Sequence, residues 1–403
     1  MEGETRRGSF LEVLAVFLRL GLTSFGGPVA HLGYFREEIV ARRKWLSEAA
    51  YADLVALCQL LPGPASSQVG IALGLRRAGL PGGLAAWLGF TSPSAIALIL
   101  FAYGVAAFGD VGGAGWLNGL KAAAVAVVAL AVWGMAGSLC PDKPRAAIAI
   151  AATVAMLAWP TSWGQLVVIA VAGIIGWRFL RTGQSDAEQE RQFAVSRWVA
   201  GFCLVVFGVL LLGLPILGRA LAAGGLTELL QVFDSFYRAG SLVFGGGHVV
   251  LPLLQELVVA PGWVTNTEFV AGYGAAQAVP GPLFTFSAYL GIFVGMPPGW
   301  AGGLFALFAI FLPSFLLVIG VAPFWDRLRS WASFGGALRG INAAVVGLLL
   351  AALYDPVWTS AIHGTEDFGL ALVTLGLLAI WKWPPWLVVA LSASVGQALT
   401  YVV

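Results

Sequence analysis

Apolar stretches long enough to cross a membrane follow one another along almost the whole of this chain. A transmembrane helix needs about 20 predominantly apolar residues. The stretches that approach or exceed this length are residues 10–34, 49–75, 80–108, 117–139, 146–159, 161–181, 197–217, 233–257, 266–296, 300–322, 336–354, 368–381 and 385–403. Only 10% of residues are charged and 59% are hydrophobic, whereas about 25% of a soluble protein is charged. We therefore predict an all-α polytopic membrane protein and exclude a soluble enzyme, a nucleic-acid-binding protein and a disordered chain.

The sequence contains two copies of one unit. LRLGLTSFGG at 18–27 matches YRAGSLVFGG at 237–246, and QLLPGP at 59–64 matches QAVPGP at 277–282. Further matched pairs follow in the same order: Glu37 with Glu256, Trp45 with Trp263, Pro93-Ser94 with Pro313-Ser314, and Lys121 with Asn342. We predict a first transmembrane repeat over residues 1–180 and a second over 233–403. Between them lie a polar cytoplasmic linker, 181–196, and a connecting helix with a short amphipathic segment, 197–232.

Positive charges are distributed oppositely in the two repeats. In the first repeat, Lys and Arg occupy the loops after the first two apolar segments and are then absent until Lys121. In the second repeat there is none between Arg238 and Arg327. Because cytoplasmic loops are enriched in Lys and Arg, this pattern predicts that the repeats are inverted relative to each other, as in many secondary transporters.

Each repeat is expected to contain two broken or re-entrant helical hairpins, one at FGG and one at PGP. Prolines break a helix and leave backbone groups unpaired, which is tolerated in a membrane only where protein or water satisfies them. The helix-breaking prolines are Pro62, Pro64, Pro280 and Pro282. With four hairpins about nine crossings remain, which place the N-terminus inside and the C-terminus outside; plain spans would give about thirteen.

Arg19 and Arg238 occupy equivalent positions upstream of the two FGG elements. An arginine deep in a membrane costs at least about 2.5–3.5 kcal/mol, so a duplicated one suggests a function. Two guanidinium groups can neutralise a dianion and donate in a bidentate fashion to an oxyanion. The alternative is that each arginine snorkels to the interface or pairs with a carbonyl group.

The residues at and beside the hairpin tips are the other candidate ligands of an anion. Glycine allows the backbone to approach a ligand, and the N-terminus of a half-helix offers free N–H groups to an anion. Glutamine and hydroxyl side chains add donors. The candidates are Ser24, Phe25, Gly26, Gly27, Gln59, Gly63, Ser66, Phe244, Gly245, Gly246, Gln277, Gly281 and Thr285.

A few titratable groups are candidates for proton coupling. His31 and His248 follow the FGG elements, and histidine titrates near neutrality, although a hydrogen-bonded structural role is the favoured interpretation. Glu37 and Glu256 are equivalent and could also carry protons. Lys121 is a candidate accessory cation. The sequence has no phosphate-binding loop and no His, Cys or carboxylate cluster typical of metal sites or hydrolases, so we expect no cofactor, no metal and no enzyme activity.

These paired motifs resemble the chromate ion transporter (CHR) superfamily in its long, two-domain form. The resemblance covers about residues 10–140 and 233–400, and one departure is that Pro28 in the first copy faces Gly247 in the second. It implies chromate efflux driven by the proton motive force, with sulfate as a structural analogue, across the inner membrane of a prokaryote. The residues that match the family motifs are Arg19, Phe25, Gly26, Gly27, Gln59, Pro62, Gly63 and Pro64, with Arg238, Phe244, Gly245, Gly246, Gln277, Pro280, Gly281 and Pro282 in the second half.

Together these features predict a secondary transporter of tetrahedral oxyanions, embedded in a lipid bilayer and without a nucleic-acid partner. A sulfate or anion importer driven by proton symport is an alternative, and so is an anion channel. Small residues spaced as in Gly70 and Gly74, or Gly291 and Gly295, would allow a homodimer.

Overall fold

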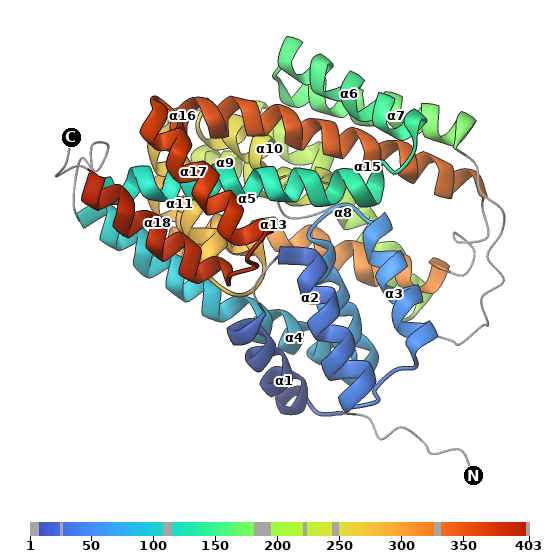
Figure 1. The fold of residues 1–403 in the computed structure, drawn as a ribbon. Helices are drawn as coiled ribbons and strands as arrows, with labels where there is room; N and C mark the ends of the chain where they lie inside the picture. The colour runs from blue at the N-terminus through green and yellow to red at the C-terminus, as the bar shows by residue number, and fades with distance from the viewer. Residues whose placement is uncertain are drawn as a thin grey trace.

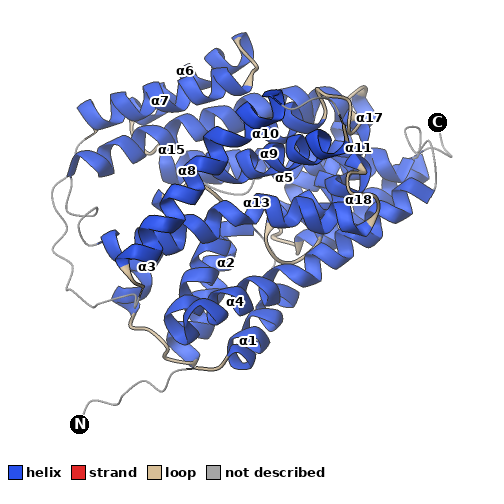
Figure 2. Cartoon of the chain, turned by 180° about the vertical axis from the view of Figure 1, so that it is seen from behind, coloured by secondary structure: helices blue, strands red, loops and turns tan. Residues whose placement is uncertain are grey.

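A computed structural model shows the chain as a bundle of α-helices. The structure describes residues 8–24, 27–107, 115–180, 195–220, 224–243, 250–325 and 332–399. Within these ranges there are helices and loops but no strand (Figure 2). The predicted all-α fold is therefore confirmed, and most of the predicted linker lies outside the described residues.

The described elements of the first repeat are α1 (Phe10–Thr23), α2 (Gly27–Phe35), the π-helix η1 (Arg36–Arg42), α3 (Glu48–Leu60), α4 (Ala65–Ala107), α5 (Gly115–Leu139), α6 (Lys143–Ala158) and α7 (Ser162–Phe179). Helix α8 (Arg197–Ala220) connects the repeats. The second repeat comprises α9 (Gly225–Leu242), α10 (Val250–Val258), α11 (Asn266–Ala278), η3 (Leu283–Thr285), α12 (Phe286–Val294), α13 (Trp300–Val321), η4 (Ala322–Phe324), α15 (Ala332–Ala352), η5 (Leu353–Trp358), α16 (Thr359–Ala361), α17 (Thr365–Ala379) and α18 (Pro385–Leu399).

Helix starts follow local capping signals in the sequence. The Ser9 hydroxyl accepts a hydrogen bond from the Glu12 amide and so caps α1. Thr265 and Glu268 form a reciprocal capping box at the start of α11, which satisfies two amides that would otherwise lack a partner. The Asp142 side chain caps α6 as the Ser9 side chain caps α1, by accepting a hydrogen bond from a backbone amide of the first turn.

Five helical stretches of the described residues are long and apolar enough to cross a membrane. They are Ala65–Ala107, Gly115–Gly137, Arg197–Gly218, Trp300–Phe324 and Gly335–Asp355. The helices at the FGG and PGP motifs are shorter: α1 has 14 residues and α3 has 13. At 1.5 Å per residue these lengths are about 20 Å, less than the hydrocarbon thickness of about 30 Å. The breaks predicted at the prolines are present, since α3 ends before Pro62 and α11 ends before Pro280.

The two repeats exchange their last helices. Helices α6 and α7, from the first repeat, pack along α15 of the second, and α17 and α18 pack along α5 of the first (Figure 1). Glycines make the contact close: the backbone of Gly340 touches the carbonyl of Ala172, and that of Gly119 touches the carbonyl of Ser392. These two contacts are equivalent, so the repeats are related by a pseudo-twofold axis.

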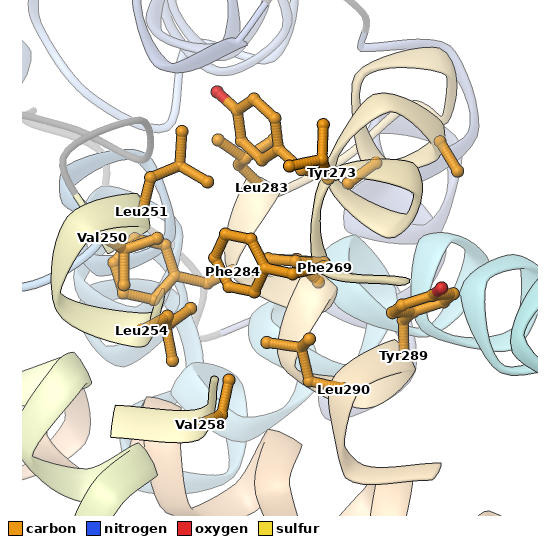
Figure 3. Packing of buried hydrophobic residues seen from close by; sticks show 14 of the residues in the cluster. Val250, Leu251, Leu254, Val258, Phe269, Tyr273, Leu283, Phe284, Tyr289 and Leu290 are labelled. Carbon is orange, nitrogen blue, oxygen red and sulfur yellow. The ribbon is translucent and has the colours of Figure 1, made fainter. Parts of the chain in front are cut away.

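The pseudo-symmetry fails at one pair of elements. In the second repeat, α10 packs on α9 and α15, while α11 packs on α5 and α18; their apolar side chains form a continuous core with α12 (Figure 3). In the first repeat, α2 and α3 pack mainly on α4 and η1. Among the described residues, neither α2 with α5 nor α3 with α15 or α7 makes a contact of comparable extent. The α10–α11 unit is docked on the interlocked helices, and its counterpart is not.

The glycine faces that could have supported a homodimer are used inside the chain. Gly74 packs against the backbone of Gly82, and Gly291 packs against the backbone of Gly302. Gly70 faces the ring of Phe17. These faces bring consecutive helices together within each repeat, so they are not free to form an interface with a second copy.

Candidate functional site

The PGP segment of each repeat is hydrogen-bonded to the end of the first helix of the other repeat. The Gly63 amide donates to the carbonyl of Val243 at 2.5 Å, and the Gly281 amide donates to the carbonyl of Ser24 at 2.9 Å. Val243 and Ser24 are the C-terminal caps of α9 and α1, directly before the two FGG motifs. Each PGP loop therefore meets the residue that directly precedes the FGG motif of the other repeat, and we call this region the crossing.

Glycine is required at both PGP positions. Gly63 has φ +118 and Gly281 has φ +101, values that other residues rarely adopt. A Cβ atom on Gly63 would lie 3.0 Å from the Ser314 hydroxyl, and one on Gly281 would lie 2.9 Å from the Ser94 hydroxyl. Ser94 and Ser314 are the matched serines of the two Pro-Ser pairs, so each PGP loop packs against the serine of the opposite repeat.

Buried polar atoms without a partner are concentrated on the segments that form the crossing. Six such atoms are Ser24 Oγ, Ser67 Oγ, Gln68 Oε1, Thr91 Oγ1, Gln277 Nε2 and Ser314 Oγ. Leaving a buried polar group unpaired costs about 1–3 kcal/mol. Four of the six are hydroxyl groups and one is an amide nitrogen, and these five can donate a hydrogen bond, whereas Gln68 Oε1 can only accept one. The crossing is therefore suited to an anion that would satisfy these donors.

Close contacts place some of these groups beside the two PGP loops. The Gln68 amide donates to the Pro62 carbonyl at 2.6 Å and would touch a Cβ atom on Gly63. The Ser94 hydroxyl donates to the Thr91 carbonyl at 3.1 Å, next to Gly281. The sequence motifs do not single out Gln68, Thr91, Ser94 and Ser314 as ligands. The signal that could have identified Ser94 and Ser314 is the matched Pro-Ser pair.

The two candidate arginines differ in their surroundings. Arg238 is partly buried on α9, and its Nη2 donates to both carboxylate oxygens of Asp234 at 2.9 and 3.0 Å. The position equivalent to Asp234 in the first repeat is Ala15. Arg19 is exposed on α1, and its charge acts on the Glu38 carboxylate. The two equivalent arginines therefore differ, one in a partly buried ion pair and one exposed, and their binding role stays a prediction.

Two of the predicted hydroxyl ligands already have protein partners. The Ser66 hydroxyl lies 3.3 Å from His31 Nδ1, and the Thr285 hydroxyl donates to the Pro282 carbonyl at 2.7 Å. Of the two glutamines, Gln59 is exposed, whereas Gln277 has a buried, unpaired Nε2. Gln277 is thus the better placed of the pair.

Several predicted residues lie at the FGG tips, outside the described residues: Phe25, Gly26, Phe244, Gly245, Gly246 and His248. Gly27, which is described, begins α2 with φ +78. His31 is buried, and its ring stacks edge-on against Phe90 at 5.1 Å between centroids.

The remaining charged candidates are not at the crossing. Lys121 is buried on α5, with the carboxylate of Asp367 on α17 as its opposing charge. Glu37 is exposed in η1, whereas Glu256 is partly buried on α10 and lines a separate cavity. The described residues contain no group of three His, Cys, Asp or Glu side chains that could hold a metal ion.

The neighbouring Glu38 anchors the basic loop of the first repeat. It is buried, and it accepts hydrogen bonds from Arg43 at 2.8 Å and Arg42 at 3.0 Å. Burial alone would raise the pKa of Glu38, but the hydrogen bond from Arg43 and the charges of Arg43, Arg42 and Arg19 lower it below its ordinary value. The basic loop therefore carries an internal ion pair instead of a free cluster of positive charges.

Comparison with known proteins identifies the family. A family model described as chromate transporter matches residues 11–177 and 230–397, one match in each repeat. This chain belongs to the chromate transporter family.

Chromate transporter relatives match over nearly the full chain. The chromate transport protein of Pseudomonas aeruginosa is 28% identical over 93% of this chain and 88% of its own length. That of Cupriavidus metallidurans is 28% identical over 92% of this chain and 88% of its own length. The uncharacterized transporter YwrA of Bacillus subtilis is 28% identical over 43% of this chain but 98% of its own length, so it is the size of one repeat. No solved structure matches this chain.

Proposed function

We propose that this protein is a secondary active transporter that exports chromate, with sulfate as an analogue or competitor, driven by the proton motive force. The full-length relatives are named as chromate transport proteins, and chromate and sulfate are tetrahedral dianions. The protein would lie in the cytoplasmic membrane of a prokaryote, with its N-terminus inside and its C-terminus outside.

The crossing carries this proposal. Its unpaired donors come from both repeats, and each PGP glycine is hydrogen-bonded to the helix that precedes the FGG motif of the other repeat. A tetrahedral oxyanion has four oxygen atoms that accept hydrogen bonds, so it can take donors from the group formed by Ser24, Ser67, Thr91, Gln277 and Ser314. Binding midway between two repeats is the common arrangement in secondary transporters.

Positive charge for the dianion would come from Arg19 and Arg238. The ion pair of Arg238 uses only its Nη2 atom, which leaves further guanidinium donors. An inside-negative potential already favours export of a dianion, by about 2.3 kcal/mol per charge per 100 mV and hence about 4.6 kcal/mol in all. Proton antiport would add to this driving force without being required by it.

Two alternatives remain distinct from export. Sulfate import by proton symport would use the same site with a different coupling. Measuring the net charge moved per transported anion in liposomes distinguishes this import from chromate export. An anion channel would show flux that neither saturates nor exchanges labelled for unlabelled anion. Two pseudo-symmetric repeats in unequal conformations favour a transporter over a channel, because a channel has no need of alternating states.

The test is voltage-driven chromate flux in proteoliposomes, with sulfate as competitor, for the wild type and Ser314→Ala. If the Ser314 hydroxyl binds the anion, its loss should raise the half-saturating chromate concentration by roughly tenfold or more, because a hydrogen bond to a charged group contributes about 1.5–3 kcal/mol. The same change should not lower the melting temperature without anion, since an unpaired hydroxyl stabilises nothing.

The matched control is Ser287→Ala. The Ser287 hydroxyl is equally buried but donates to the Phe284 carbonyl at 2.8 Å, so its removal should cost stability and leave chromate affinity in place. Unchanged affinity in Ser314→Ala would remove this residue from the site. Absence of chromate flux in the wild type, with and without a pH gradient, would overturn the proposed function.

A further inference from the structure

A partly open cavity lies where helices from the two repeats meet. Its volume is about 380 Å³. It is lined by α6 and α7 of the first repeat and by α10, α15 and η5 of the second. We call it the interlock cavity, because it lies where the exchanged α6–α7 pair packs on α15 of the second repeat (Figure 1).

The charged residues that line this cavity are both acidic. Glu256 comes from α10 and Asp355 from η5, and no Lys, Arg or His is among the lining residues. The Asp355 carboxylate accepts a hydrogen bond from the Thr359 hydroxyl at 3.1 Å. Asp355 is exposed and Glu256 is partly buried. Most of the remaining wall is apolar: Met156, Leu157, Pro160, Pro252, Val259, Ala260, Leu348, Ala351 and Ala352.

A buried amide without a partner also lines the interlock cavity. Gln165 on α7 is 2% exposed, and its Nε2 atom makes no hydrogen bond. A half-turn of the amide exchanges its oxygen and nitrogen, so the same side chain can offer an acceptor to a cation or a donor to a carboxylate. Gln255, at the rim, already donates from Nε2 to the Asn266 side chain at 3.2 Å. Gln165 is therefore the group that an occupant of the cavity would satisfy.

The first repeat does not contain the acidic pair of this cavity. The counterpart of Glu256 is Glu37, which is exposed in η1. Following the match of Lys121 with Asn342, the counterpart of Asp355 is Gly134, which has no side chain. The acidic pair thus belongs to one repeat only, and it is brought together by the docking of α10 on α15.

We propose that the interlock cavity binds one small monovalent cation, a proton or Na⁺, between Glu256, Asp355 and Gln165. Two carboxylates and one amide are too few oxygen ligands for Ca²⁺, which takes six to eight. Because the site is assembled only when α10 is docked, the cation stabilises the docked state, and a ligand that prefers one state shifts the equilibrium towards it. The cation site deepens the proposed function and depends on it, because it would supply the coupling ion of oxyanion transport.

Other charged groups on the packed elements do not line the cavity. On α9, Asp234 and Arg238 pair with each other, and Glu228 is exposed. Arg145 on α6 pairs with Asp142, on which the charge of Arg339 of α15 also acts. The other such groups are Lys143 on α6 and Arg178 on α7. Within the described residues, a change in protonation or Na⁺ occupancy inside the cavity is therefore carried by Glu256 and Asp355.

Binding is tested without any oxyanion, on the purified full chain in detergent. The melting temperature is followed in a Na⁺ titration at fixed pH with choline as the replacement, and in a pH titration without Na⁺. A cation that binds only the folded state raises the melting temperature with concentration until it saturates. We expect Glu256→Gln and Asp355→Asn to lose the response that the wild type shows, and Glu228→Gln, a control at an exposed carboxylate on α9 outside the cavity, to keep it. Identical responses in the wild type and Glu256→Gln would overturn the proposal, as would a response to Ca²⁺ alone.

Transport then separates the cation site from the proposed function. In proteoliposomes with clamped voltage, a pH or Na⁺ gradient should drive chromate uptake by the wild type, and Glu256→Gln should lose it by about tenfold or more, the size of a typical coupling factor. Glu228→Gln again serves as the control. Chromate flux with no cation dependence would overturn the cation site and leave the proposed function standing. A melting temperature that responds to the cation, together with no chromate flux under any gradient, would overturn the proposed function and leave the cation site standing.

Discussion

At the scale of single residues, the crossing depends on two glycines whose conformation no other residue adopts readily. Gly63, with φ +118, holds the amide that bonds the opposite repeat. In Gly63→Ala, the new Cβ would lie 2.7 Å from the Gln68 amide and 3.0 Å from the Ser314 hydroxyl. We expect a loss of about 1–3 kcal/mol in unfolding free energy, together with loss of chromate flux, measured by thermal melting and by liposome uptake.

The control for this change is Gly33→Ala on α2. Gly33 has open space where a Cβ would lie, and alanine is the better helix former by about 0.5–1 kcal/mol. Gly33→Ala should therefore melt at or above the wild-type temperature and transport normally. Equal behaviour of the two variants would show that the PGP conformation is not needed.

The ion pair of Glu38 predicts a pH dependence of stability. Its pKa is lowered in the folded protein, so its contribution is present above the unfolded value of about 4.3 and is lost as pH falls through the folded value. Glu38→Gln should melt below the wild type at pH 7, and the gap should close as the pH is lowered below about 4. A gap that stays constant from pH 7 to pH 3 would mean that packing, and not charge, is what Glu38 contributes.

At the scale of elements, the exchanged helix pairs hold the repeats together. Gly340 on α15 lets the backbone of α7 approach at Ala172, so Gly340→Leu would force α7 away from α15. Overpacking of this kind costs about 1–3 kcal/mol or more in unfolding free energy, so we expect a lower melting temperature. We also expect limited proteolysis to release the α6–α7 pair from the rest of the chain faster than in the wild type. Gly137→Leu on α5, where the space is open, should melt like the wild type.

The sequence predicts where the helices of this fold begin and end better than it predicts which helices pack together. Apolar length and the prolines locate the helices and their breaks, because these follow from bilayer thickness and from the missing proline N–H. The exchange of α6–α7 and α17–α18 between repeats could not be predicted, since Gly119 and Gly340 mark a close contact without naming the opposite helix. For the same reason, the spacing of Gly74 and Gly291 suggested an interface between two copies of the chain, whereas both glycines pack inside one chain.

The candidate site shows a similar division. Repeated motifs point to the PGP and FGG segments, and the structure bonds each PGP loop to the cap of the helix before the FGG motif of the other repeat. The sequence could not show that Thr285 would be satisfied by its own turn while Ser314 would be left unpaired, because both are hydroxyls beside a break. Nor could it show that Arg238 pairs with Asp234 while Arg19 is exposed, although the change of Asp234 to Ala15 between copies hints at it.

At the scale of the whole molecule, the two repeats are equivalent in sequence but unequal in conformation. The α10–α11 unit is docked on the interlocked helices, and the α2–α3 unit is not. When related repeats adopt two conformations, exchanging them gives a second state of the same molecule, with the first unit docked and the second released. Such an exchange would move access to the crossing from one side to the other, as alternating access requires.

This exchange predicts a contact that the present state lacks. Val259 and Leu348 line the interlock cavity together, and their counterparts in the first repeat are Val40 and Val127. With the native Cys58, Cys140 and Cys203 replaced by alanine, a bifunctional thiol reagent should join the pair Val259→Cys and Leu348→Cys in the resting protein. The pair Val40→Cys and Val127→Cys should be joined only during chromate turnover. Either link should stop transport until it is reversed, since each holds one state. Protein linked at both pairs at once could not pass from one conformation to the other. Undiminished chromate flux through such protein would therefore show that transport does not require the repeats to exchange conformations.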